Sequence, residues 1–169
     1  ISFFSEKPQA QVVAVLTNKS TAKVLERCDR MGVPGFYFNK PAFRESDAVL
    51  RLLKGLEADL VVLAGFLWKV PTHLIEAFPN KIINIHPALL PKYGGKGMYG
   101  DRVHQAVKES QETETGITIH YVNENYDEGA IIFQAKTKVD PSDTPETIAQ
   151  KVHQLEYEHF PKVIEKVLS

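Results

Sequence analysis

Two polar residues, Asn84 and His86, have the types and spacing expected of catalytic groups. They stand at the carboxyl end of residues 81–86, an apolar run whose pattern predicts a strand. Side chains two apart on a strand point to the same side of a sheet, so both can act on one atom. An imidazole, with an ordinary pKa of about 6.5, can carry protons near neutrality, and an amide N–H can stabilise an oxyanion. The pair indicates acyl-transfer chemistry, although such a pair alone is more often a structural hydrogen-bond site.

The elements that position this pair follow a strand–helix alternation. Continuous apolar runs predict strands at residues 11–17, 35–38, 59–65 and 81–86. Helices are predicted between them, the first capped by Ser20 or Thr21 and ended by Gly32. Later patterns predict a long Gly/Pro-rich loop at 87–100, a helix near 102–109, a hairpin-like pair at 117–121 and 130–139, and a terminal helix from 144. The sequence thus predicts one α/β domain over residues 1–169, with a Rossmann-like wound sheet, mostly parallel, and a C-terminal hairpin-like strand pair and helix.

Composition limits the kind of protein. The 169 residues include 20 basic and 21 acidic side chains, giving a net charge of −1. This balance disfavours a nucleic-acid or membrane-surface protein and favours a small-molecule substrate. Cys28 is the only cysteine, which excludes an internal disulfide and fits a cytoplasmic location. Residues 1–8 read as a helix end halted before Pro8, so we expect that an N-terminal segment precedes them.

A longer string makes the acyl-transfer interpretation specific. Residues 83–93 read INIHPALLPKY, and Tyr-Asp-Glu-Gly follows at 126–129. Over almost the whole chain the sequence resembles the folate-dependent formyltransferases, most closely those of purine biosynthesis. The resemblance implies transfer of the formyl group of 10-formyltetrahydrofolate to the amine of glycinamide ribonucleotide, without a metal. Alternatives are a formyltetrahydrofolate hydrolase, which uses water as the acceptor, and a non-catalytic folate-binding module.

The resemblance also assigns site residues. Asn84, His86 and Asp127 match the family's catalytic trio, in which the carboxylate is expected to raise the pKa of the histidine. The expected folate contacts are Leu67, Trp68, Lys69, Val70, Asn84, Val122, Asn123, Glu124 and Asp127. The expected contacts of the amine substrate are Glu156, Thr118 and Pro87. The family's glycine-rich phosphate loop has no counterpart here, which agrees with the expected missing segment.

Overall fold

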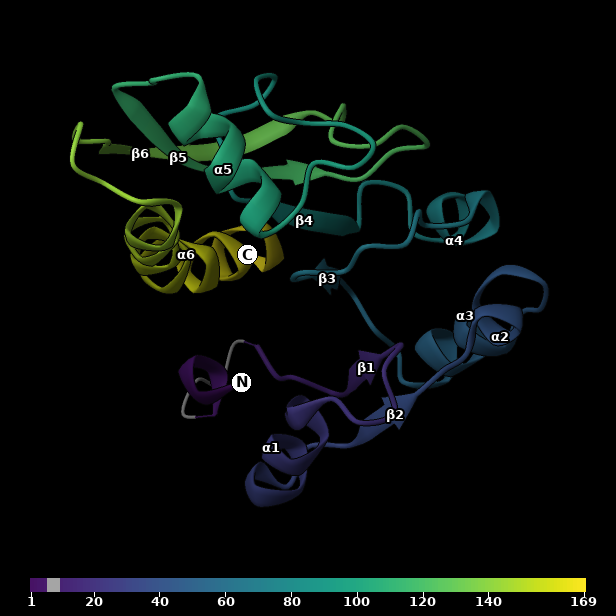
Figure 1. Cartoon of the computed structure of the whole chain (residues 1–169). Coiled ribbons are helices and arrows are strands. Elements are labelled where there is room, and N and C mark those ends of the chain that lie inside the picture. Colours follow the sequence, from purple (N-terminus) through teal and green to yellow (C-terminus); the bar gives the residue numbers. More distant parts are fainter. Residues whose placement is uncertain (6–9) are drawn as a thin grey trace. The chain divides into compact units, whose positions relative to one another are not determined.

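A computed structural model describes residues 1–5 and 10–169 (Figure 1). Its first element is the short 3-10 helix η1, Ser2–Phe4, and the proline expected to halt it, Pro8, lies outside the described residues. The chain divides into two compact units, Ile1–Asp59 with Leu168–Ser169, and Leu60–Val167. A single domain over residues 1–169 therefore stays a prediction.

The first unit contains a two-stranded parallel sheet with its helices (Figure 1). Strand β1, Val15–Thr17, pairs with β2, Gly35–Tyr37. The helices are α1, α2 and α3, which span Lys23–Met31, Lys40–Arg44 and Ala48–Gly55. Strand β1 is shorter than the predicted run 11–17 and only partly buried, because β2 is its one paired neighbour among the described residues.

The end of helix α1 agrees with the prediction, whereas its start does not. It ends at Gly32, whose φ of +63° lies in the left-handed region that glycine adopts without steric cost. The predicted cap at Ser20 or Thr21 is wrong, because the N-cap residue is Ala22. Ala22 donates its N–H to the carbonyl of Lys19, so the two hydroxyl residues lie in a turn before the helix.

The second unit contains a four-stranded mixed sheet in the order β3-β4-β5-β6 (Figure 1). The strands span Val61–Leu63, Ile82–His86, Glu114–Tyr121 and Ile131–Lys138. The β3–β4 pair is parallel, while β4–β5 and β5–β6 are antiparallel. Helices α4, α5 and α6 span Thr72–Ala77, Asp101–Glu109 and Pro145–Leu168. The predicted α/β class, with parallel strands followed by an antiparallel hairpin and a terminal helix, is confirmed.

Alternation along β4 and β5 gives this sheet an apolar and a polar face. Ile83, Ile85, Ile117 and Ile119 form the apolar face and join one core with residues of α5 and α6. Asn84, His86, Thr118 and His120 occupy the alternate positions. Burying one such isoleucine contributes about 1.5–3 kcal/mol, and a one-residue slip of either strand would turn its two isoleucines away from this core. The apolar face therefore fixes the register that aligns the polar residues.

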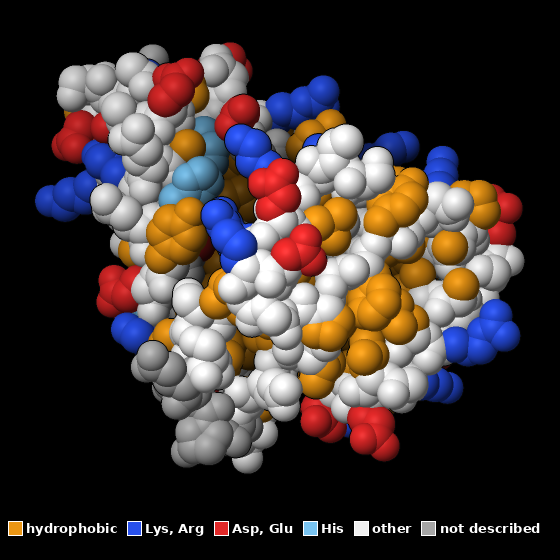
Figure 2. Space-filling model, turned by 90° about the horizontal axis from the view of Figure 1, so that it is seen from below, with side chains coloured by type: hydrophobic (Ala, Val, Ile, Leu, Met, Phe, Trp, Pro, Cys, Tyr) orange, Lys and Arg blue, Asp and Glu red, His pale blue; other side chains and the backbone are white. Residues whose placement is uncertain are grey.

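The surface carries charges of both signs. Figure 2 shows Lys and Arg side chains interspersed with Asp and Glu over the face that it presents, rather than separated by sign. In the described part of the chain, no helix combines the length and apolar character needed to span a bilayer.

Candidate active site

The strand β4 brings Asn84 and His86 opposite two residues of β5. Asn84 pairs with His120 across the antiparallel ladder, and His86 pairs with Thr118. His86 is buried, with 3% of its surface exposed, whereas Asn84 is partly exposed. The pair predicted from its spacing thus lies on one face of a sheet and beside a second histidine.

The hydrogen bonding of His86 determines which of its nitrogens can exchange a proton. Its Nε2 lies 2.7 Å from the carbonyl oxygen of Tyr93, which can only accept. Nε2 therefore carries a hydrogen and donates it. The other nitrogen, Nδ1, lies 3.6 Å from Oδ2 of Asp127. The proton that His86 gains or loses is consequently held at Nδ1, beside the carboxylate.

Asp127 is held by the loop that follows β4. Its Oδ2 accepts the backbone N–H of Gly95 at 2.9 Å, and its Oδ1 lies 3.6 Å from Nε2 of His120. Burial raises the pKa of Asp127, but the His120 and His86 imidazoles and the Gly95 N–H outweigh burial, so the pKa lies below its ordinary value. Asp127 is therefore a carboxylate at neutral pH.

The glycine after this aspartate allows the chain to turn back closely. A Cβ at Gly129 would overlap the carbonyl of Tyr121 at the end of β5. That same carbonyl accepts a hydrogen bond from Nδ1 of His120 at 2.8 Å. The close approach at Gly129 thus brings the turn after Asp127 against the carbonyl that His120 also contacts.

Opposing effects set the pKa of His86. We expected Asp127 to raise it, and the carboxylate does act in that direction, as does the Tyr93 carbonyl. Burial is the larger effect, however, and with His120 it lowers the pKa below 6.5. The effect expected of the carboxylate is therefore present, but it is smaller than the effect of burial. His86 is neutral at physiological pH, the state in which it can accept a proton.

The second histidine fixes the Asn84 amide. Because His120 donates from Nδ1 to Tyr121, its Nε2 is the acceptor for Nδ2 of Asn84, at 3.2 Å. An amide nitrogen has two hydrogens, so Asn84 retains one N–H for a ligand. This oriented donor can meet an oxygen that becomes negatively charged.

Thr118 holds the loop after β4. It is fully buried, and its hydroxyl donates to the carbonyl of Ala88 at 2.7 Å while accepting the N–H of Leu90 at 2.9 Å. Gln134 of β6, opposite Thr118 in the sheet, also donates to this hydroxyl at 2.9 Å. In this arrangement Thr118 orders the site through residues 88–90.

The other expected ligand residues lie on three separate segments. The segment after β3 contains Leu67 and Lys69, which are exposed, Trp68, which is partly exposed, and Val70, which is buried. Residues 122–124 begin the loop that leads to Asp127. Glu156 lies in α6, where burial raises its pKa and His153 opposes the increase. The residues that contact one another come from β4, β5 and the loops that follow them. They are Asn84, His86, His120 and Asp127.

Sequence reasoning missed the roles of Tyr93 and Gly95. Both supply backbone groups, so their side-chain chemistry gives no signal. Their position in a loop that directly follows the Asn-x-His strand was the available indication.

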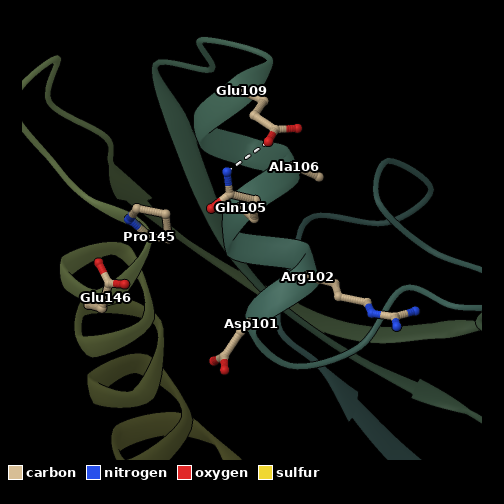
Figure 3. Close-up of a pocket in the computed structure, with 7 residues that line it drawn as sticks. All are labelled: Asp101, Arg102, Gln105, Ala106, Glu109, Pro145 and Glu146. Carbon is tan, nitrogen blue, oxygen red and sulfur yellow. Dashed lines mark hydrogen bonds between the residues drawn. The ribbon is translucent and has the colours of Figure 1, made fainter.

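A pocket of about 420 Å³ lies away from these residues, between α5 and the start of α6 (Figure 3). Its lining includes three carboxylates, those of Asp101, Glu109 and Glu146, and the guanidinium of Arg102. None of the trio contributes to it. Among the described residues, no group of three or more His, Cys, Asp or Glu side chains is arranged to hold a metal ion.

Comparison with known proteins identifies the family of this chain. The sequence profile of the formyl transferases matches residues 3–164. Phosphoribosylglycinamide formyltransferase, chloroplastic, of Arabidopsis thaliana is 42% identical over 158 residues, covering 90% of this chain and 54% of that protein. Phosphoribosylglycinamide formyltransferase of Bacillus subtilis is 38% identical, covering 96% of this chain and 83% of that protein. The chain thus spans about half of one relative and most of the other.

A solved structure agrees with the sequence comparisons. The crystal structure of phosphoribosylglycinamide formyltransferase from Bacillus halodurans superposes with a TM-score of 0.84 at 33% identity, covering 95% of this chain and 82% of that one. The α/β fold of this chain is therefore shared with solved phosphoribosylglycinamide formyltransferases. The chain belongs to the formyl transferase family.

Proposed function

We propose that this protein transfers the formyl group of 10-formyltetrahydrofolate to the primary amine of glycinamide ribonucleotide. The observation that carries the proposal is the arrangement of Asn84, His86 and Asp127 at the end of β4. One amide N–H remains for an oxygen, and one imidazole nitrogen faces a carboxylate. The relatives named above carry this activity in their names, which supports the same reaction here.

The three side chains divide the chemistry. The substrate amine attacks the formyl carbon, and Asn84 donates its N–H to the oxygen as charge builds on it. Nδ1 of His86 accepts a proton from the attacking nitrogen and passes it to the folate nitrogen as the carbon–nitrogen bond to the donor breaks. Asp127 stabilises the imidazolium that exists between these two steps.

The expected ligand residues surround this centre in the proposal. Leu67, Trp68, Lys69 and Val70, with Val122, Asn123 and Glu124, receive the folate, largely through backbone groups. Glu156 and Pro87 receive the amine substrate, while Thr118 orders the loop. Support for a role of Glu156 is its partly buried carboxyl, whose pKa burial raises while His153 opposes the increase.

Product formation tests the proposal. The protein is incubated with 10-formyltetrahydrofolate, with and without glycinamide ribonucleotide, and tetrahydrofolate release and formylated product are both measured. We expect release only with the amine, and a decrease of about 100- to 10,000-fold in His86→Ala. His159→Ala in α6 is the matched control and should retain activity.

Folate release without the amine would instead support the hydrolase alternative, which the relatives' names do not favour. Absence of turnover under both conditions would leave the non-catalytic alternative. The expected cytoplasmic location stays a prediction, since two relatives are named as chloroplastic.

A further inference from the structure

We propose that Glu112, acting through Tyr93, is a positioning residue that fixes the proton-bearing atom of His86. The inference rests on the proposed function for its effect on turnover but not for its effect on the imidazole. It concerns two residues outside the trio, one in the loop after β4 and one just before β5. Their contacts form a continuous path to the active-site histidine.

The backbone of Tyr93 is in an unfavourable conformation that an anchor must maintain. Its φ is +56°, in the left-handed region that residues other than glycine seldom occupy. Its ring packs against the apolar core, and its hydroxyl donates to Oε1 of Glu112 at 2.9 Å. These contacts at the ring and at the hydroxyl hold the residue where its carbonyl reaches Nε2 of His86.

Glu112 is itself held from two sides. Its N–H donates to the carbonyl of Val107 in α5 at 3.3 Å, and Lys92 donates to the same Oε1 at 2.8 Å. Its side chain is 23% exposed, compared with 67% for Lys92. The tyrosine bond is therefore the more sheltered of its two side-chain contacts, and the lysine pair is the more screened by water.

The loop around Tyr93 contacts both His86 and Asp127, the two side chains between which the proton is held. The Tyr93 carbonyl accepts from Nε2 of His86, and two residues later the Gly95 N–H donates to Asp127. Release of the tyrosine hydroxyl would let the backbone leave the left-handed region and withdraw the carbonyl. The neutral imidazole of His86 could then carry its hydrogen on either nitrogen. Nδ1, the nitrogen beside Asp127, would no longer always be free to accept a proton.

Four variants separate this role from general stability. Tyr93→Phe and Glu112→Ala remove the hydroxyl bond, while Glu112→Gln keeps an acceptor oxygen for it. Lys92→Ala removes only the exposed ion pair. We expect Tyr93→Phe and Glu112→Ala to lower kcat about 10-fold with KM changed less than about 2-fold, the size of effect of one lost hydrogen bond. Glu112→Gln and Lys92→Ala should stay near wild type.

Nitrogen-15 NMR of the imidazoles gives a reading independent of activity. We expect His86 to be a single tautomer with hydrogen on Nε2 in the wild type and in Glu112→Gln, and a mixture in Tyr93→Phe and Glu112→Ala. An unchanged tautomer together with unchanged kcat in Glu112→Ala would overturn the inference. A tautomer change in a protein that transfers no formyl group would support the inference while contradicting the proposed function.

Discussion

Replacement of Thr118 by valine should cost about 2–4 kcal/mol of unfolding free energy. The two side chains have nearly the same shape, so the change removes the hydroxyl and leaves the packing in place. The loss leaves the Leu90 N–H and the Gln134 amide without that acceptor and the Ala88 carbonyl without its donor. Gln134 still donates to the Leu90 carbonyl at 3.1 Å, so two buried backbone groups become unpaired, at about 1–2 kcal/mol each.

Thr115 provides a matched control three residues earlier in β5. It is 3% exposed, and its hydroxyl is buried without a hydrogen-bond partner in the described structure. Thr115→Val therefore removes an unpaired polar group and should be neutral or stabilising. Urea unfolding of both variants gives the two free energies. Equal losses, or a loss below about 0.5 kcal/mol for Thr118→Val, would refute the role of this hydroxyl in holding the loop.

Three other changes have defined outcomes. Asn84→Ala loses the N–H that meets the formyl oxygen, so its kcat in steady-state kinetics should fall about 100- to 1,000-fold. A decrease in kcat below about 5-fold would exclude that role. The acid limb of the kcat/KM profile should lie below pH 6.5, because burial lowers the pKa of His86. In Asp127→Asn this limb should move to still lower pH, because the carboxylate that favours imidazolium is lost. A shift to higher pH would contradict these electrostatic effects. The ion pair with Lys151 lowers the pKa of Asp143 from 3.8 to about 2, so ionised Asp143 stabilises the fold above pH 3.8. Thermal melts of Asp143→Asn should therefore show a lower Tm than wild type at neutral pH and no difference near pH 2. A decrease in Tm that is independent of pH would count against the ion pair.

The local sequence predicted the parts of the site that depend on side-chain alternation. Strand β4, Ile82–His86, ends at His86, as the apolar run 81–86 indicates, and the buried Ile83 and Ile85 on either side of Asn84 explain why that signal was strong. The antiparallel pair after residue 114 was predictable for the same reason. Most residues of β5 are buried on both faces, and the alternation of apolar and polar side chains gives the sequence a period of two.

The parts that escaped prediction depend on contacts between distant segments. Tyr93 and Gly95 act through backbone atoms, whose chemistry is the same in every non-proline residue. His120 contacts Asn84 and Asp127, and these contacts appear only once β4 and β5 are paired. The direction of the His86 pKa also required burial, which outweighs the charge of its neighbour.

In the proposed reaction, Asn84, His86 and Asp127 move a formyl group from a folate nitrogen to an amine. This transfer can be followed by NMR with 10-formyltetrahydrofolate that carries carbon-13 in its formyl group, in the presence of glycinamide ribonucleotide. We expect the label to appear on the ribonucleotide nitrogen with the wild type and with Thr115→Val. His86→Ala should slow this transfer about 100-fold or more. Label found as free formate, or transferred equally fast by His86→Ala, would refute the proposed reaction.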